Sequence, residues 1–272
     1  WTVTDLIREK TISLEGAALL WLAVQNEMSI IVSGGTASGK TSILNTIANF
    51  FPPNQRIISI EDTRELTLPK LLHWVPMETR LANPEGKGGV EMLDLIINSL
   101  RMRPDRVIVG EIRRKGEAEV LFEAMHTGHS VYGTMHANNA RETINRLTSP
   151  PIDLPKQILT GLSLIAVQNI NRRTGKRRTL QIAEILPDGD SKVIMQLNPI
   201  KDQLEFVAEP LTMIENVNLY TGLSKEGFFA DIQSKIAILK WMADKNVNDI
   251  NKIGLIMSKY YHNRPFISVK GV

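Results

Sequence analysis

The stretch GGTASGKT at residues 34–41 has a spacing suited to phosphate groups. It fits the pattern G-x-x-x-x-G-K-[ST], with Gly34, Gly39, Lys40 and Thr41 at the required positions. The glycines let backbone N–H groups face the phosphates, the lysine reaches the terminal phosphates, and the threonine hydroxyl binds Mg²⁺. The residues expected to bind a nucleotide are Gly34, Gly35, Thr36, Ala37, Ser38, Gly39, Lys40, Thr41 and Ser42.

The surroundings of this stretch distinguish a phosphate loop from a glycine-rich turn with an exposed lysine. The β-branched run MSIIVS precedes it and the helical pattern SILNTIANFF follows it, which is the context that the motif requires. A guanine-reading N-K-x-D motif would favour GTP, but NKIG at 251–254 lacks the aspartate. We therefore predict Mg²⁺-dependent ATP binding through residues 34–42.

Acidic residues follow two further apolar runs. Glu61 and Asp62 come directly after RIISI, and Glu111 follows RVIV and Gly110. Ligands of an open α/β sheet bind beyond the carboxyl ends of its strands, where the phosphate loop also lies. We therefore expect these acids to act at Mg²⁺ and on the attacking water, and not to be solvated loop carboxylates.

Two histidines flank the run GHSVYGTMH at 128–136. On one continuous strand, His129 and His136 would face opposite sides of the sheet and could not share a metal. His136 is expected at the phosphate edge, where an imidazole can sense the γ-phosphate. For His129 a packing role at the helix end is slightly favoured over a catalytic one, and His126 is expected to pack.

Strand-like and helix-like segments alternate around these motifs. Apolar runs predict strands at 28–33, 56–60, 106–109 and 129–134, and helical spacing predicts helices at 42–51, 90–103, 117–128 and 139–147. The alternation is typical of an α/β protein with a mostly parallel sheet and helices on both faces. Two runs around the basic stretch RRTGKRR, residues 172–178, predict an antiparallel hairpin over 164–185.

The C-terminal part has a weaker pattern. No clear periodicity runs from Pro187 to about residue 215, after which helices are predicted at 231–245 and 248–263. The longest apolar stretch, GAALLWLAV, is shorter than the roughly 18 residues of a membrane span.

The composition is that of a soluble globular protein. Of 272 residues, 43% are hydrophobic and 22% are charged. The net charge of +3 is too small to indicate nucleic-acid binding by itself. The absence of cysteine excludes disulfides and thiolate zinc sites, and favours a reducing, cytosolic setting. The chain begins at Trp1, so it is expected to be a fragment of a longer protein.

Four stretches in order, GGTASGKT, ISIEDTRE, RMRPDRVIVGE and AMHTGHSVYGTMHAN, resemble the type II/IV secretion ATPase superfamily. This superfamily comprises the motors of type II secretion, type IV pili and archaeal flagella. LLWLAVQ, HWVPMETR, LRMRPDR and the tail MSKYYHNRPF are similar to its archaeal branch. The resemblance covers roughly residues 4–265.

The resemblance implies roles for individual residues. It implies Lys40 for phosphate, Thr41 and Glu111 for Mg²⁺, Glu61 as general base, His129 and His136 as the family's paired histidines, and Arg101 and Arg103 as catalytic arginines. Arg80 and Arg113 are further candidates for charge compensation. GEIRRKGEAEV is one residue longer than in many relatives, which leaves the roles of Arg114 and Lys115 open.

The family fold implied is a RecA-like P-loop NTPase core at 28–187, between a helical N-terminal segment at 1–27 and a mostly helical region at 188–272. The family's separate N-terminal domain is expected to be absent from this chain. The implied function is a hexameric ATPase at the cytoplasmic face of the membrane, whose partner is a polytopic inner-membrane platform protein.

Two other functions remain open. A RecA-like nucleic-acid translocase is the first alternative, and RRTGKRR is its main support. A solvated turn or a subunit contact explains that stretch better, because no aromatic stacking platform accompanies it, and no stable nucleic-acid partner is expected. An inactive assembly subunit is the second alternative, which the intact Lys40, Glu61 and Glu111 disfavour.

Overall fold

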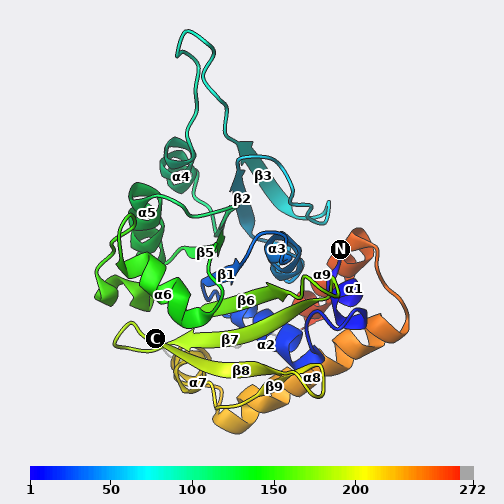
Figure 1. Ribbon diagram of the computed structural model, residues 1–272. Coiled ribbons are helices and arrows are strands. Elements are labelled where there is room, and N and C mark those ends of the chain that lie inside the picture. The colour runs from blue at the N-terminus through cyan, green and yellow to red at the C-terminus, as the bar shows by residue number, and fades with distance from the viewer. Residues whose placement is uncertain (264–272) are drawn as a thin grey trace.

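One nine-stranded β-sheet runs through the protein (Figure 1) in the computed structural model, which describes residues 1–263. The strand order is β3-β2-β4-β5-β1-β6-β7-β8-β9. The strands are β1 (Ile30–Gly34), β2 (Arg56–Glu61), β3 (His73–Glu78), β4 (Arg106–Val109), β5 (Ser130–Met135), β6 (Leu164–Ile170), β7 (Arg177–Ile185), β8 (Ser191–Asn198) and β9 (Gln203–Phe206). Parallel pairing from β3 to β6 and antiparallel pairing from β6 to β9 confirm the predicted mostly parallel α/β fold.

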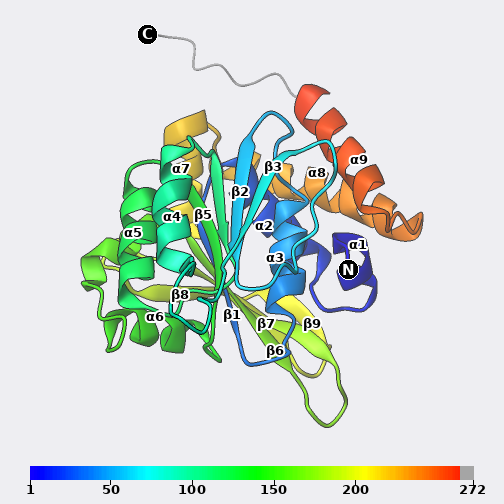
Figure 2. The ribbon, with the colours of Figure 1, turned by 90° about the horizontal axis from the view of Figure 1, so that it is seen from above.

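Helices cover both faces of this sheet (Figure 2). They are α1 (Val3–Arg8), α2 (Leu14–Gln25), α3 (Lys40–Ala48), α4 (Met92–Arg101), α5 (Lys115–His126), α6 (Ala140–Thr148), α7 (Leu211–Thr221), α8 (Lys225–Asp244) and α9 (Ile250–Asn263), with a short 3-10 helix, η1 (Lys156–Gly161). Helices α4, α5 and α6 lie on one side of the sheet, and α2, α3, α8 and α9 lie on the other.

The apolar strand runs are continuous because both faces of the central strands are buried. In β1, Ile30 and Val32 pack into the core under α2 and α3, whereas Ile31 packs into the core under α5 and α6. All five residues of β1 are buried. This double burial fixes the strand from which the phosphate loop leaves.

Three strands lie outside the sequence-based expectations. Strand β3 forms one edge of the sheet and includes Pro76, and β9 forms the other edge beside β8. Edge strands are half exposed, so they lack the continuous apolar run that marked the central strands. The predicted hairpin at 164–185 is β6 and β7, the first half of a longer antiparallel meander.

The region 188–272 therefore begins with two strands of the main sheet before its helices. Helix α7 was not expected, and α8 begins at Lys225, earlier than the predicted helix at 231–245. The last residues of that region, 264–272, lie outside the described part of the chain, as does the end of the quoted tail. Within residues 1–263 the helices are all too short or too polar to cross a membrane.

Candidate functional site

The phosphate loop joins β1 to α3, and its shape depends on two glycines. Gly39 precedes the first residue of α3 with φ +95°, a left-handed conformation that side chains other than glycine rarely adopt. A Cβ on Gly34 would lie 2.6 Å from the Gln168 carbonyl oxygen of the adjacent β6. The motif glycines thus permit a tight turn directly against the neighbouring strand.

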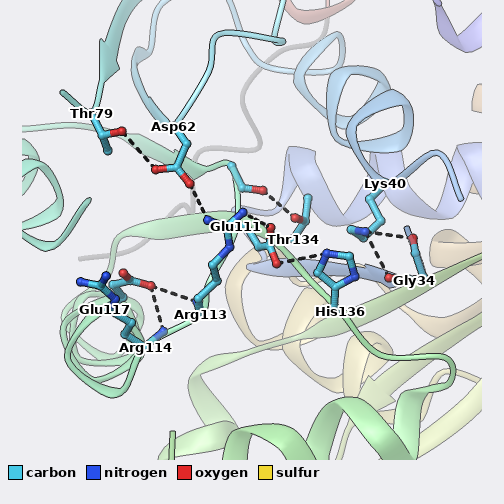
Figure 3. Close-up of polar contacts among 12 residues, drawn as sticks. Gly34, Lys40, Asp62, Thr79, Glu111, Arg113, Arg114, Glu117, Thr134 and His136 are labelled. Atoms are coloured by element: carbon cyan, nitrogen blue, oxygen red, sulfur yellow. Dashed lines mark hydrogen bonds and ion pairs between the residues drawn. The ribbon is translucent and has the colours of Figure 1, made fainter. Parts of the chain in front are cut away.

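The lysine of the motif folds over this loop. Lys40 Nζ donates to the carbonyl oxygens of Gly34 at 3.1 Å and of Gly35 at 3.0 Å, as Figure 3 shows in part. Burial lowers the pKa of Lys40, and the nearby carboxylates of Glu111 and Glu65 oppose that shift. The ammonium group therefore lies within the electrostatic reach of Glu111.

Glu111 is the centre of a polar cluster beside the loop (Figure 3). Its Oε1 lies 3.3 Å from His136 Nε2, and its Oε2 accepts a 2.7 Å bond from Arg113. Arg113 also pairs with Asp62 at 2.6 Å, so one guanidinium bridges two acids from different strand ends. Hydrogen bonding to Glu111 raises the pKa of Arg113 above its usual value.

Asp62, Glu111 and His136 thus lie together at the carboxyl ends of their strands, as expected from their positions in the sequence. Parallel pairing of β2, β4, β5 and β1 places their last residues along one side of the sheet. Thr134 adds a connection between two of these strand ends, because its hydroxyl donates to the Gly110 carbonyl oxygen at 2.5 Å. Glu111 and His136 therefore face the phosphate loop from the β4 and β5 side.

Glu61, at the end of β2, is only 3% exposed. Its Oε1 accepts backbone N–H bonds from Glu65 at 2.9 Å and Leu66 at 3.0 Å, which fixes the start of the following loop. Its Oε2 is buried and has no hydrogen-bond partner among the described residues. Burial raises the pKa of Glu61, although the two backbone bonds oppose the shift. A buried carboxylate with a raised pKa at a strand end is a candidate general base.

The longer stretch after Glu111 forms the start of α5. The Glu117 carboxylate accepts the backbone N–H groups of Arg113 and Arg114. The Arg114 side chain pairs with the exposed Glu91 at 3.0 Å, and Lys115 approaches Glu119 and Asp153. Among residues 1–263, neither basic side chain has an ion pair with Asp62, Glu111 or His136.

Arg101, Arg103 and His129 lie at the amino ends of the parallel strands, opposite the phosphate loop. Arg101 and Arg103 are exposed where α4 ends, before β4 begins, and His129 precedes β5. The one side-chain hydrogen bond of His129 among the described residues is with Thr127 Oγ1, at 3.4 Å. Within one chain these three residues are therefore not brought to the phosphate loop.

Arg80 lies in a third place, on the loop between β3 and α4 that projects from the body of the protein (Figure 1). Its Nε donates to the Gly88 carbonyl oxygen at 2.6 Å, and its backbone pairs with Val90. His126 also serves the local structure, because its Nε2 contacts the Ile158 carbonyl oxygen at 2.8 Å.

A cavity of about 660 Å³ opens beside the phosphate loop. Residues 37–42 form one wall, Trp1, Leu6 and Thr11 contribute a second, and the turn 174–178 forms a third. A second cavity of about 450 Å³ is lined by Glu111 and His136 and extends to Arg146. The sequence motifs alone gave no reason to place the basic turn at the loop.

The side chains present fit a magnesium ion. Mg²⁺ prefers oxygen ligands and is usually bound by one or two carboxylates together with substrate phosphates and waters. The Thr41 hydroxyl at the start of α3 and the Glu111 carboxylate supply such oxygens beside Lys40. Among residues 1–263, groups of three or more His, Asp or Glu with metal-binding geometry are absent.

The chain is similar in sequence to a family of secretion system proteins and to individual proteins from archaea and bacteria. The family model described as Type II/IV secretion system protein matches residues 3–198. The uncharacterized protein MJ1287 of Methanocaldococcus jannaschii is 37% identical over 252 residues, which cover 87% of this chain and 90% of that protein. The type IV secretion system protein PtlH of Bordetella pertussis is 40% identical over 182 residues, covering 61% of this chain and 52% of PtlH.

A solved structure agrees with these sequence matches. The crystal structure of the VirB11 ATPase from the Brucella suis type IV secretion system, in complex with sulphate, aligns with a TM-score of 0.52 and 28% identity. The alignment covers 61% of this chain and 50% of the VirB11 chain. This chain thus spans most of MJ1287 but about half of PtlH and VirB11.

Proposed function

The chain belongs to the type II/IV secretion system protein family, as its motifs predicted, and we propose that it is an ATP-hydrolysing motor of a secretion or pilus-like machine. The observation that carries the proposal is the cluster of Lys40, Glu111 and His136 beside one phosphate loop. Phosphoryl transfer needs little beyond positioning and charge stabilisation, which these groups supply.

Each residue has a distinct part in this proposal. The backbone of residues 34–39 and the Lys40 ammonium group hold the phosphates, and Glu111 and Thr41 would hold Mg²⁺, which neutralises charge on the phosphate oxygens. Glu61 accepts the proton of the attacking water, and the raised pKa of its buried carboxyl suits that task. His136 contacts the terminal phosphate, and Arg113 compensates the negative charge of Asp62 and Glu111.

Assembly is part of the same proposal. Arg101, Arg103 and His129 lie far from the loop along the strands, so they can act on a nucleotide only when another subunit presents them. A closed ring, which we take to be a hexamer, provides that contact. The ring would act at the cytoplasmic face of the membrane, on a polytopic platform protein. Whether it drives secretion, a pilus or an archaeal flagellum depends on that partner.

The alternative function is a RecA-like nucleic-acid translocase. The basic turn 172–178 is exposed over most of its length, which would suit a phosphate backbone. Single-stranded DNA or RNA should stimulate the ATPase rate of a translocase several-fold, whereas a secretion motor should show no such stimulation. This comparison, made at low salt with the full-length protein, separates the two functions.

Lys40→Ala tests the nucleotide site. Removing the ammonium group should abolish binding of a fluorescent ADP or ATP analogue and eliminate hydrolysis. Lys245→Ala is the matched control, because Lys245 is exposed at the end of α8. Hydrolysis at the normal rate by Lys40→Ala would refute the assignment, provided that the control variant behaves like the natural protein.

A further inference from the structure

The basic stretch Arg172–Arg178 reaches the phosphate loop. Strand β6 is the parallel neighbour of β1, and Gly34 is in register with Gln168. Only two residues of β6 follow Gln168 before the chain turns back towards β7. The β6–β7 turn therefore overhangs the loop, and residues 174–178, which form the end of this turn and the start of β7, line the 660 Å³ cavity.

Arg177 makes the direct contact in this region. Its Nε donates a 2.9 Å hydrogen bond to the Ala37 carbonyl oxygen. A Cβ placed on Gly39 would lie 3.3 Å from Arg177 Cδ, so the side chain also packs along the loop. Ala37 has φ +60°, a left-handed conformation that costs free energy in residues other than glycine. The Arg177 bond satisfies a carbonyl of this strained residue.

Arg178 holds Arg177 in place. Its guanidinium forms two 2.7 Å bonds to the Asp202 carboxylate and a 3.1 Å bond to the Glu9 carbonyl oxygen. Successive strand residues point to opposite faces, so anchoring Arg178 on one side directs Arg177 to the other. The turn is thus tied to the β8–β9 connection and to the N-terminal segment.

The sheet order indicates which end of a nucleotide this turn would meet. Glu111 and His136 lie on the β5 side of β1, and the β6–β7 turn lies on its other side. If the terminal phosphate faces the acids, the nucleoside must extend towards the β6–β7 turn, where the larger cavity lies. Arg177 then stands between the phosphate chain and the nucleoside.

We propose that Arg177 is a positioning residue of the nucleotide site, which holds the phosphate loop in its binding shape at Ala37. The inference rests on the proposed ATPase function. It accounts for part of the basic stretch without a nucleic acid. Because Arg177 acts on the loop and not on the γ-phosphate, its effect should be the same for every ligand that the loop binds.

The test compares Arg177→Ala with Arg173→Ala in the full-length protein. Arg173 is an exposed arginine of the same turn, and its side chain has no hydrogen bond or ion pair within the described residues. Arg177→Ala should weaken binding of ADP, of a non-hydrolysable ATP analogue and of inorganic tripolyphosphate by the same factor, about tenfold. It should raise the KM for ATP much more than it lowers kcat, and Arg173→Ala should change neither.

The outcomes distinguish a failure of the proposed ATPase function from a failure of the proposed role of Arg177. If the natural protein binds no ADP, the proposed function fails. If it binds ADP and Arg177→Ala binds equally well, only the role of Arg177 is overturned. A lower melting temperature with unaltered ligand affinity would also overturn it, because that pattern describes a purely structural residue. Loss of single-stranded DNA binding with unchanged ADP affinity would assign the turn to nucleic acid instead.

Discussion

The carboxyl and amino ends of the parallel strands form two edges of the central sheet, and these differ in how their polar residues are arranged. At the carboxyl edge, Glu111 contacts Arg113 and His136, and Arg113 continues the contacts to Asp62. At the amino edge, Arg101 and Arg103 are exposed and separate from that cluster. In the proposed function the first edge binds the nucleotide within one chain, whereas the arginines of the second edge act on the nucleotide of a neighbouring subunit.

The amino edge also contains a buried arginine, which sharpens the difference. Arg106 is completely buried, donates to Gln55 at 2.7 Å and hydrogen-bonds the Tyr132 hydroxyl. It packs over the rings of Phe51 and Tyr132. An arginine held in this way serves the fold, whereas Arg101 and Arg103 are exposed, as their proposed contact with a neighbouring subunit requires.

The largest effect is expected from those two arginines. Arg101→Ala and Arg103→Ala should leave ADP affinity unchanged but reduce ATP turnover, by roughly a thousandfold if either acts as an arginine finger.

Mixing subunits of two different variants should then restore part of the ATP turnover. Rings formed from Arg101→Ala and Lys40→Ala subunits would contain some sites with an intact loop and an intact neighbouring arginine. Rings of Glu61→Gln and Lys40→Ala are the control, because they should regain little activity if both residues act within one chain. Failure of the first mixture to recover would contradict action between subunits.

Glu61→Gln should reduce turnover by at least about a hundredfold, the usual contribution of a general base, while nucleotide binding persists. Glutamine keeps the size and can still accept the backbone bonds of residues 65 and 66, so the loop should retain its shape. Steady-state hydrolysis and ADP binding measure the two properties separately. Normal turnover in this variant would make Glu65 or Glu111 the better candidate.

Glu111→Gln should instead change the response to Mg²⁺. The neutral amide weakens the metal shell, so half-maximal hydrolysis should require a severalfold higher Mg²⁺ concentration, and excess Mg²⁺ should partly restore the rate. A titration of hydrolysis against Mg²⁺ in both glutamate variants distinguishes their roles. Identical Mg²⁺ curves for Glu111→Gln and the natural protein would exclude Glu111 as the metal ligand.

Substitution of the two histidines compares the edges directly, because His136 lies at the carboxyl edge and His129 at the amino edge. His136→Ala should reduce the preference for an ATP analogue over ADP by about tenfold or more, because one charge-assisted hydrogen bond contributes roughly 1.5–3 kcal/mol. His129→Ala should leave that preference unchanged in the isolated subunit. Bound zinc that disappears with His136→Ala would show that His136 is a metal ligand and refute the sensor role.

The smallest effect concerns stability. Burial raises the pKa of Glu61 in the folded protein. At pH values above the usual glutamate pKa of about 4.3, the preference of this group for its neutral form therefore destabilises the folded state. Stability linked to this group is lost as pH rises through the folded-state pKa and regained as pH falls. Glu61→Gln should therefore be more stable than the natural protein at pH 7.5, with a higher urea concentration at the unfolding midpoint. The difference in stability between the variant and the natural protein should narrow as the pH is lowered, which urea unfolding at a series of pH values measures.

The sequence by itself determined the fold class and the phosphate-binding motif. The four doubly buried strands β1, β2, β4 and β5 have apolar runs that the pattern identifies. Parallel strands end at one edge, so the convergence of Glu111 and His136 on the phosphate loop followed from their positions after those runs. Local spacing is sufficient there, because each motif adjoins the strand that positions it.

Only the tertiary structure decided what depends on distant contacts. Strands β3, β8 and β9, at or next to the edges of the sheet, are half exposed, so their sequences carry little periodic signal. The burial of Glu61 depends on the loop that folds back over it, and the Arg113 bridge depends on two strand ends meeting. Arg177 lies 140 residues from Ala37 in sequence and reaches it because β6 pairs beside β1. Residue types alone could not distinguish this arginine from its solvated neighbours, because the distinction lies in the pairing of strands distant in sequence.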